Sequence, residues 1–326
     1  MAESMPNSTY QEHLLQLAEL EIGERFQDEP LAAHNSWQIG GPADLLIEPA
    51  TIGQVATVVS FARGHGLPLL VIGQGTNLLF DDAGLRGVVL KLGDNLSRVE
   101  ISGNRIIAEA GAWVPGLARR AMQAGLAGLE HIIGIPGTFG GLVLMNGGSQ
   151  RRGIGENVRR VWVVDREDRV RTLTRDDCHF SYRHSALQET GAVVVKAELE
   201  CEHSEPQLIR RAMLEDLRER RRKFPRKLPN CGSVFLSTSA MHASVGPPGK
   251  IIEEAGLKGT RIGQAEVSPQ HANFIVNLGG ATSRDVLSLI AHIRRVVFER
   301  IGFELCCEVR YVNTTGELVP AHLASG

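Results

Sequence analysis

The sequence predicts an α+β protein, because helix and strand patterns are mixed along it without the strict alternation of a parallel-sheet protein. Strand-like runs follow one another between residues 87 and 109, and an alternating pair at Val161–Asp165 and Val170–Leu173 is typical of a hairpin. Two long periodic helices are expected later, at Pro206–Lys223 and Ser283–Ile301. The chain has 326 residues, which at roughly 100–200 residues per domain is enough for two or three packed units.

Caps and breakers mark the elements of the first part of the chain. Thr51 is placed to cap a helix that Gly64 or Gly66 ends, and Pro115 takes the favoured first position of a helix that Gly125 ends. The expected order is a short amphipathic helix in residues 11–22, strand Leu45–Glu48, the Thr51 helix, strand Leu67–Ile72, strands Gly87–Leu92, Leu96–Ile101 and Arg105–Glu109, the Pro115 helix, the hairpin, and strand Ala192–Glu200.

The pattern changes after Glu205. The helix Pro206–Lys223 carries one apolar stripe, which is expected to be buried and consists of Leu208, Met213, Leu214 and Leu217. Its basic end, Arg220–Pro225, is interpreted as a domain junction. The expected order beyond it is a loop-rich part Pro229–Gly249, a short helix Lys250–Ala255 ended by Gly256, a strand near Phe274–Asn277, the helix Ser283–Ile301, a strand Phe303–Val312 and a tail in residues 313–326.

Composition excludes several classes of protein. The net charge of −2 favours neither nucleic acid nor an anionic membrane as a partner. Residues Met1–Tyr10 lack the apolar core of a signal peptide, and the most apolar window, His131–Met145, is shorter than the roughly 20 residues of a membrane helix. The five cysteines have no CxxC spacing and the histidines no HExxH pair, so we expect no metal site. A reduced cytoplasmic enzyme is the simplest setting.

Two glycine-rich segments are the strongest local signals. Gly134–Gly148 reads GIPGTFGGLVLMNGG, which is too broken for a helix interior and too apolar for a solvated linker. Gly73–Asn77 reads GQGTN and follows an apolar strand-like run. It fails the Rossmann pattern, because position 78 is Leu and no helix pattern follows. Each segment alone is read as a tight turn, whereas the pair suggests a diphosphate bound from two sides.

The chain resembles the UDP-N-acetylenolpyruvoylglucosamine reductases (UDP-N-acetylmuramate dehydrogenases) through an ordered set of motifs. Any one motif is weak, but the set covers roughly residues 35–312. The motifs are IGGPAD at Ile39–Asp44, GQGTNLLF at Gly73–Phe80, GLAGLEHIIGIPGTFGG at Gly125–Gly141, MNGG at Met145–Gly148, SYRHS at Ser181–Ser185, CGSVF at Cys231–Phe235, EEAGLKG at Glu253–Gly259, VSPQHANFIVN at Val267–Asn277 and CEVRYV at Cys307–Val312.

This resemblance implies a fold and a division into domains. We expect a helical lead-in at 1–33, a two-part FAD-binding domain of the vanillyl-alcohol-oxidase (PCMH) type at 34–204, a smaller α+β substrate-binding domain at 205–312, and the tail. The short spacing between SYRHS and the strand Ala192–Glu200 resembles the shorter subclass, which lacks an extra substrate-covering loop.

The resemblance also implies a reaction. NADPH reduces FAD, which passes hydride to the enolpyruvyl double bond of UDP-N-acetylenolpyruvoylglucosamine, and protonation gives UDP-N-acetylmuramate for peptidoglycan precursor synthesis. By motif match, Ser233 is the proton donor, Arg183 stabilises the enolate and carboxylate, and Glu308 is the partner of this pair. Each also has an ordinary alternative: Ser233 as a turn serine, Arg183 as a surface residue and Glu308 as an outward residue of a strand.

The resemblance assigns binding residues as well. The cofactor-binding residues are Gly73, Gln74, Gly75, Thr76, Asn77, Gly134, Ile135, Pro136, Gly137, Thr138, Gly140, Gly141, Asn146 and Gly147. The candidates for substrate binding are Arg220, Lys223, His271 and Asn273. For His271 and Asn273, a packing or hydrogen-bonding role is an equal alternative. The basic run around Lys223 is offset by nearby acidic residues and does not favour nucleic acid.

One departure from the family pattern concerns the substrate. The family continues GSxF with Lys-Asn-Pro, whereas this chain has Leu236-Ser237-Thr238 and a longer run through Ala240–Gly249. Two alternatives to the reductase therefore remain: another flavin oxidoreductase of the same fold, and a catalytically silent or substrate-altered paralogue.

Overall fold

The computed structural model describes residues 7–324 and divides into two compact units, each built from separate parts of the chain. The first unit comprises residues up to 27, 45–74 and 87–219, and the second comprises 28–44, 75–86 and 220 onward. The boundaries fall inside strands, inside the turn 73–77 and inside one helix, and neither unit is a continuous segment. The domain division expected from the sequence stays a prediction. The first six residues of the segment that was read as lacking a signal-peptide core lie outside the described residues.

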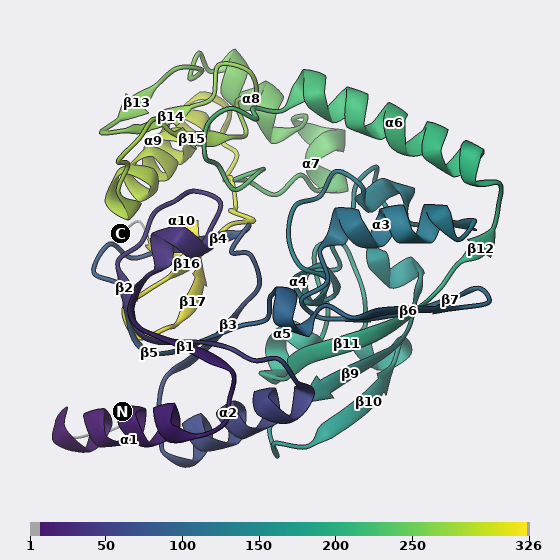
Figure 1. The fold of residues 1–326 in the computed structure, drawn as a ribbon. Coiled ribbons are helices and arrows are strands. Elements are labelled where there is room, and N and C mark those ends of the chain that lie inside the picture. The colour runs from purple at the N-terminus through teal and green to yellow at the C-terminus, as the bar shows by residue number, and fades with distance from the viewer. Residues whose placement is uncertain (1–6, 325–326) are drawn as a thin grey trace. The chain divides into compact units, whose positions relative to one another are not determined.

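The first unit contains a five-stranded antiparallel sheet of order β10-β9-β11-β7-β6 (Figure 1). Its strands are β6 (Val99–Ser102), β7 (Arg105–Glu109), β9 (Val158–Val164), β10 (Val170–Thr174) and β11 (Val193–Glu200). The predicted hairpin is confirmed, since β10 pairs with β9 in the register Val170↔Val164. The predicted strand Leu96–Ile101 starts later, because residues 94–96 form the 3-10 turn η2 (Asp94–Leu96).

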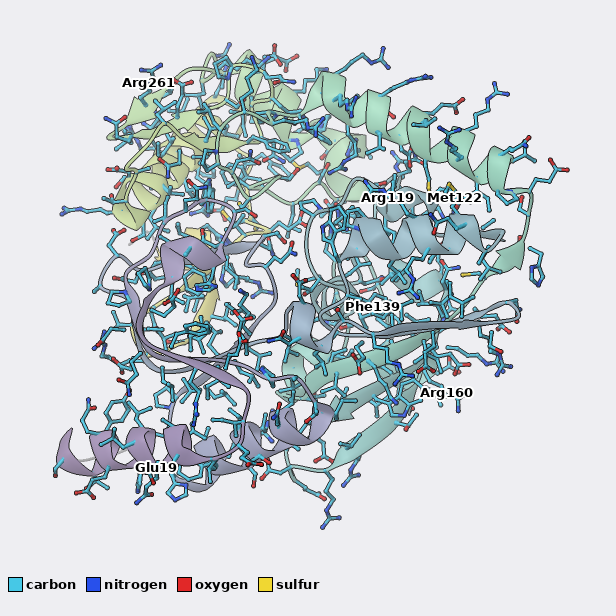
Figure 2. All side chains as sticks on the ribbon, viewed as in Figure 1. Glu19, Arg119, Met122, Phe139, Arg160 and Arg261 are labelled. Atoms are coloured by element: carbon cyan, nitrogen blue, oxygen red, sulfur yellow. The ribbon has the colours of Figure 1, made fainter. Side chains whose placement is uncertain are left out.

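Helices of this unit pack on that sheet and on a second, mixed sheet. They are α1 (Asn7–Glu19), α2 (Ile52–Gly64), α3 (Val114–Gln123), α4 (Phe139–Leu144) and α5 (Leu187–Thr190), and the further 3-10 turns are η3 (Glu130–Ile132), η4 (Ile154–Glu156) and η5 (Asp176–Cys178). A capping box between Thr51 and Gln54 begins α2, as expected from the sequence. The helix α4 packs against β11 and β7, and its first residue, Phe139, is fully buried (Figure 2).

The helix α4 corrects one expectation, because Gly134–Gly148 was read as too broken for a helix. A six-residue helix fits there because Gly140 has no side chain: a Cβ at this position would lie 2.8 Å from the Cβ of Ala110. Gly140 also donates its N–H to the Ala110 carbonyl at 2.7 Å. Close backbone packing, which a local pattern does not reveal, therefore overrides the low helix propensity of glycine.

A four-stranded sheet has the order β1-β2-β5-β3, and its parallel pair β3–β5 lies in the first unit. Its strands are β1 (Glu24–Pro30), β2 (Pro42–Glu48), β3 (Leu69–Ile72) and β5 (Leu85–Lys91), and a short antiparallel pair joins β8 (Leu126–Ala127) to β12 (Glu202–His203). The helix α6 (Pro206–Lys223) runs from the first unit into the second. Its stripe differs from the prediction: Leu208 is 58% and Leu214 39% exposed, whereas Ile209 and Met213 are buried.

The second unit is organised around α9 (Ser283–Ile301), whose predicted bounds are confirmed. Thr282 and Asp285 form a capping box at its start, and Gly302 ends it with φ +67°. Two three-stranded sheets, of orders β13-β14-β15 and β17-β16-β4, belong to this unit, and α9 packs against β13 and β14. The elements are η1 (Leu31–His34), β4 (Leu78–Phe80), α7 (Ser239–Ser244), α8 (Pro248–Glu254), β13 (Arg261–Ile262), β14 (Ala265–Val267), β15 (Ile275–Asn277), β16 (Arg310–Val312), β17 (Leu318–Pro320) and α10 (Ala321–Ala324).

The C-terminal part of this unit differs from the sequence-based expectation. The strand expected at Phe303–Val312 is only β16, and the segment expected as a tail contains β17 and α10. β17 pairs with β16 in the register Val312↔Leu318. β16 also pairs with β4, in parallel, so it is the middle strand of this sheet and is hydrogen-bonded on both sides. The last two residues of the expected tail lie outside the described part of the chain.

Candidate functional site

The sequence-predicted site residues divide between the two units. The first unit holds Arg183, Gly73 and Gln74 together with every predicted cofactor residue from Gly134 to Gly147, and the second holds Ser233, Glu308, Gly75, Thr76, Asn77 and the four substrate candidates. The division falls inside the GQGTN turn, between Gln74 and Gly75.

The two glycine-rich segments meet in the first unit. Gly73 follows β3 directly, and a Cβ at this position would lie 2.0 Å from Oγ1 of Thr138. Thr138 is the N-cap residue of α4, but its side chain makes no capping hydrogen bond. Only glycine at position 73 therefore lets the turn approach the Thr138 hydroxyl this closely. The structure thus brings together the two segments that the sequence singled out.

Some of the predicted cofactor residues use their main chain inside the protein. The N–H groups of Gly140 and Gly147 donate to the carbonyls of Ala110 and Leu142, both at 2.7 Å. Gly141, by contrast, is exposed, and a Cβ there would have only the Thr138 hydroxyl within 4 Å, at 3.7 Å. The exposed and half-buried part of this segment consists of Gly134, Ile135, Pro136 and Gly141. Among the predicted residues of this segment, these four are the ones with surface available to a ligand.

Asn146 connects the glycine-rich segment to the turn that carries Arg183. Its side-chain Nδ2 donates to the Ser181 carbonyl at 2.7 Å, and its Oδ1 accepts from the Gly155 N–H at 2.9 Å. Asn146 is 9% exposed and has φ +43°, a backbone region that asparagine tolerates better than most residues. In the structure its side chain therefore joins three loops, a role that the motif alone did not indicate.

Arg183 itself lies in a tight, left-handed position. Its φ is +55°, and Ser181 and His184 exchange two backbone hydrogen bonds, of 3.0 and 3.2 Å, across the turn. The Gln188 side chain donates to the Arg183 carbonyl at 3.2 Å and to the Leu144 carbonyl at 3.1 Å. The Arg183 guanidinium lies 5.6 Å from the centroid of the Tyr182 ring. Side-chain hydrogen bonds thus hold the backbone of this turn.

In the second unit, Ser233 and Glu308 lie on adjacent extended segments. The Glu308 N–H donates to the Val234 carbonyl at 2.8 Å, and Phe235 and Cys307 form an antiparallel bridge. Both Ser233 and Glu308 are half-buried. The pKa of the nearby Cys231 thiol is raised well above its ordinary value, first by burial and then by the negative charge of Glu308. The two segments that carry these predicted residues are therefore paired through their backbones.

Asn77 connects this pair to the second half of the GQGTN turn. Its Nδ2 donates to the Glu308 carbonyl at 3.1 Å, and its own carbonyl accepts from the Arg310 N–H at 3.1 Å. Gly75 has φ +59°, and a Cβ there would lie 2.4 Å from the His34 carbonyl oxygen. A predicted cofactor segment and a predicted catalytic residue therefore share one hydrogen-bonded strand edge, the β4–β16 pair.

The substrate candidates belong to the second unit, where the Phe224 ring lies between Arg220 and His271 at centroid distances of 5.0 and 5.3 Å. The pKa of His271 is lowered, first by burial and then by the charges of Lys258 and Lys223, so the ring is neutral at pH 7. Arg220 lies over the Phe224 ring at 5.0 Å. Asn273 is different: it is 4% exposed, and both polar groups of its side chain bond to the backbone of Phe235. Its hydrogen bonds are therefore internal.

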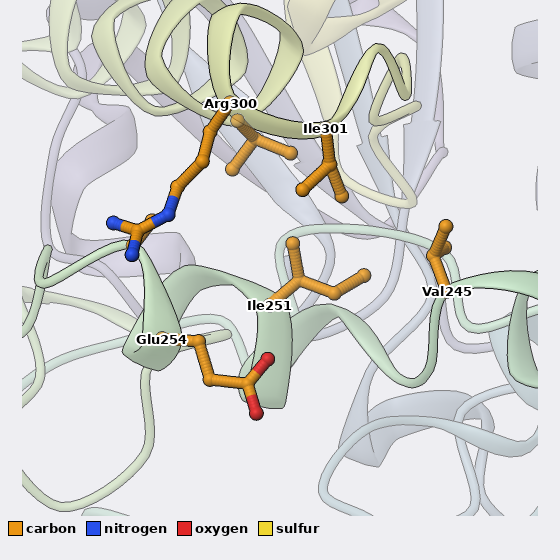
Figure 3. Close-up of a pocket in the computed structure, with 7 residues that line it drawn as sticks. Val245, Ile251, Glu254, Arg300 and Ile301 are labelled. Atoms are coloured by element: carbon orange, nitrogen blue, oxygen red, sulfur yellow. The ribbon is translucent and has the colours of Figure 1, made fainter.

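A cavity of about 560 Å³ lies elsewhere in the second unit (Figure 3). The residues that line it come from α8, the C-terminal end of α9 and the loop after α7: Val245, Ile251, Glu254, Ala255, Val297, Arg300 and Ile301. It includes none of the sequence-predicted site residues. Within residues 7–324, no cluster of three or more metal-ligating side chains and no helix long and apolar enough to cross a bilayer is found.

Comparisons with known proteins agree with these features. The model of an FAD binding domain matches residues 43–174, and that of the UDP-N-acetylenolpyruvoylglucosamine reductase C-terminal domain matches residues 224–312. The chain is 48% identical over 286 residues to UDP-N-acetylenolpyruvoylglucosamine reductase 1 of Corynebacterium glutamicum, covering 88% of this chain and 85% of the relative. It is 44% identical to the reductase of Heliobacterium modesticaldum, covering 90% and 92% of the two chains.

A solved structure agrees as well. The crystal structure of the reductase from Thermus caldophilus superposes with a TM-score of 0.73 at 32% identity, covering 86% of this chain and 96% of that one. The predicted α+β class and the predicted FAD-binding domain are confirmed. The motifs that suggested the resemblance are thus part of a similarity that extends over most of the sequence, and the chain belongs to the UDP-N-acetylenolpyruvoylglucosamine reductase family.

Proposed function

We propose that this protein is a cytoplasmic FAD-dependent reductase that converts UDP-N-acetylenolpyruvoylglucosamine to UDP-N-acetylmuramate with NADPH as reductant. Family membership supports the reductase activity in peptidoglycan precursor synthesis. The proposed roles of Ser233 and Glu308 are supported by the pairing of their segments, in which the Glu308 N–H donates to the Val234 carbonyl. The cytoplasmic setting is supported by the thiols, since all five cysteines of the chain are free and four of them are buried.

The residues present fit a cofactor with a diphosphate. The two glycine-rich turns approach each other without intervening side chains at Gly73 and Thr138, and Gly141 leaves the surface beside Thr138 open. Gln74, in the same unit, adds an uncharged amide donor, as an anion bound by main-chain and amide groups requires. The matched FAD domain includes both turns. We therefore assign FAD binding to these segments; once bound and reduced by NADPH, FAD would supply the hydride for reduction of the enolpyruvyl double bond.

The chain's own residues then have three tasks. Arg183 provides a permanent positive charge for the substrate carboxylate and for the negative charge that develops beside it. The Ser233 hydroxyl delivers the proton at carbon. A serine hydroxyl is a weak acid, so its reactivity depends on the charged groups around it, and Glu308 is the carboxylate on the neighbouring segment. Lys223 and Arg220 are candidates for the diphosphate of the nucleotide sugar, at the end of α6.

A substrate-altered enzyme is the second candidate, and one observation favours it. Where the family has Lys-Asn-Pro, this chain forms a capped helical turn: Thr238 Oγ1 accepts from the Met241 N–H at 3.2 Å, and α7 follows. Ser237 and His242 also hydrogen-bond at 2.8 Å. The side chains that this region offers to a substrate therefore differ from those of the family pattern.

Stopped-flow spectroscopy of the holoenzyme tests the proposal. NADPH is expected to bleach the bound flavin, and the enolpyruvyl sugar nucleotide is expected to restore its colour. Ser233→Ala should slow the second step by about 10²–10⁴-fold, the usual value of a positioned proton donor, while flavin reduction stays nearly unchanged. Ser244→Ala, which loses only hydrogen bonds within α7, is the matched control.

Three results would contradict the proposal. Equal slowing of both steps by Ser233→Ala would remove its role as proton donor. Fast reoxidation by oxygen without the sugar nucleotide would favour an oxidase of the same fold. Bound flavin that NADPH does not bleach would favour a silent paralogue.

A further inference from the structure

The buried amide of Asn273 holds the segment that carries Ser233. Asn273 Nδ2 donates to the Phe235 carbonyl at 3.0 Å, and Asn273 Oδ1 accepts from the Phe235 N–H at 2.9 Å. One side chain thus satisfies both backbone groups of a single residue, as a neighbouring β-strand does. Phe235 is fully buried, so no solvent replaces these bonds when they are lost.

The other edge of the segment is paired with residues 306–308. The Val234 carbonyl accepts from the Glu308 N–H at 2.8 Å, and the Leu236 N–H donates to the Cys306 carbonyl at 2.9 Å. The Val234 N–H donates to the Asn273 carbonyl at 2.9 Å. Residues 234–236 therefore lie between Asn273 on one side and the Glu308 segment on the other.

Ser233 stands at the end of this restrained stretch. The residue before it, Gly232, has φ +83° and no atom within 4 Å of where a Cβ would be. On that side one hydrogen bond, from the Gly232 N–H to Oδ1 of Asn230 at 3.0 Å, restrains the chain. The more numerous restraints on the backbone next to Ser233 therefore come from its C-terminal side, through Val234 and Phe235.

Asn273 is itself held by hydrogen bonds within its own loop. Its N–H donates to Nδ1 of His271 at 3.2 Å, and the Phe274 N–H donates to the His271 carbonyl at 3.0 Å. The Ser268 N–H closes the loop by donating to the Phe274 carbonyl at 2.8 Å. A preorganised amide of this kind can fix a catalytic group to within a fraction of an ångström.

We propose that Asn273 is a positioning residue for the proton donor: by fixing the backbone of Phe235, it aims the Ser233 hydroxyl. This inference rests on the proposed role of Ser233 and assigns to Asn273 an action through the protein backbone instead of contact with the substrate. It follows that loss of the amide impairs protonation of the substrate and leaves reduction of the flavin by NADPH intact.

The test compares Asn273→Ala with Asn277→Ala in the holoenzyme. Asn277 is a matched control because it is 3% exposed, lies in the same unit, and bonds through its amide to the Trp37 carbonyl and to the N–H groups of Gly279 and Ala281. Asn273→Ala is expected to slow reoxidation by the enolpyruvyl sugar nucleotide about 10²-fold, as expected for a misplacement of about 1 Å, with flavin reduction unchanged. Asn277→Ala is expected to change neither step selectively.

Two further readouts distinguish a positioning role from a general loss of structure. Amide hydrogen exchange at residues 234–236 should quicken in Asn273→Ala and stay slow in Asn277→Ala. The solvent deuterium isotope effect on reoxidation should rise in Asn273→Ala, because proton transfer becomes the slower event.

A second variant guards against simple misfolding. Asn273→Asp keeps the acceptor for the Phe235 N–H but loses the donor to its carbonyl, and a protonated carboxyl restores that donor. Because burial raises the pKa of a carboxyl, reoxidation by this variant should recover as the pH falls from 7 to 5, relative to the parent protein.

Equal loss in Asn273→Ala and Asn277→Ala, or no recovery of Asn273→Asp at low pH, would overturn the inference. The result for Ser233→Ala distinguishes failure of the proposed function from failure of the positioning role. If that variant reoxidises normally, the proposed function fails whatever Asn273 does. If it is inactive while both asparagine variants behave alike, only the positioning role fails.

Discussion

The turn around Arg183 and the segment around Ser233 are held in place by different sets of hydrogen bonds. Each carries a predicted catalytic residue, and each is held by the side-chain amide of a buried asparagine. Asn146 bonds to two separate loops, through the Ser181 carbonyl and the Gly155 N–H. Asn273 bonds twice to one residue, Phe235, within an otherwise regular pairing of backbone segments.

The difference lies in what else supports each backbone. The Ser233 segment has backbone hydrogen bonds to two neighbouring segments. The Arg183 turn depends more on side chains, since Ser185 and Gln188 also donate to carbonyls of its surroundings. It also places a non-glycine residue at φ +55°, which is costly for most side chains. We therefore expect that replacing Ser233 leaves the backbone of its segment in place. In the turn, replacing Arg183 also changes the cost of the left-handed backbone conformation.

The largest expected effect separates these two contributions at Arg183. Arg183→Met should lower the rate of reoxidation by the sugar nucleotide by about 10²–10³, because the charge that stabilises the developing anion is lost. Arg183→Gly should be equally slow but should fold at least as stably, because glycine adopts the left-handed conformation readily. Stopped-flow rates and denaturant unfolding measure the two quantities.

His184→Gln is the control for that pair, since His184 occupies the same turn and bonds to Glu189 at the surface. It should leave both the rate and the free energy of unfolding nearly unchanged. A large loss of stability in Arg183→Gly would show that the backbone strain inferred for this turn is absent.

A buried histidine of the first unit, His131, makes stability depend on pH in the acidic range. Burial, and then Arg152, lower the pKa of His131 to about 4 against the opposing influence of Glu156, the Gly128 backbone and Glu130. Between pH 6.5 and about 4 the unfolded chain binds a proton that the folded chain does not, so stability falls as the pH falls through this window. A fall in pKa from 6.5 to about 4 corresponds to about 3 kcal/mol.

His131→Phe should remove this dependence, so that the free energy of unfolding changes less between pH 7 and pH 4 than in the parent protein. His203→Gln, at an exposed position of β12, is the control and should keep the parent's slope. Urea titrations at fixed pH values measure both. A slope in His131→Phe equal to the parent's would mean that other groups cause the loss of stability.

The smallest of the three effects concerns the asparagine that serves the turn. Asn146→Ala leaves the Gly155 N–H without its partner and the Ser181 carbonyl with only its bond from the His184 N–H, which should reduce the free energy of unfolding by about 1–3 kcal/mol. Asn157→Ala is the matched control, because the Asn157 amide makes one hydrogen bond, to the Glu200 carbonyl, and its buried Oδ1 has no partner. Asn157→Ala should therefore reduce the free energy of unfolding by less than Asn146→Ala. Equal losses would mean that Asn146 does not hold the turn more firmly than an ordinary buried amide.

The sequence by itself determined the elements whose signals are local. The capping boxes at Thr51 and Thr282 and the apolar period of α9 involve residues within a turn or two of one another, so they can be read from the chain directly. The ordered motifs likewise indicated the family, and with it the candidate site residues.

Only the tertiary structure decided the features that depend on distant partners. Asn273 acts on a residue 38 positions away, and Asn146 on one 35 positions away, so no local pattern distinguishes them from ordinary asparagines. The exposure of Leu208 and the pairing of β17 with β16 have the same cause. Burial and strand pairing are properties of the whole packed unit, because each segment takes the partner that leaves the fewest backbone groups unpaired.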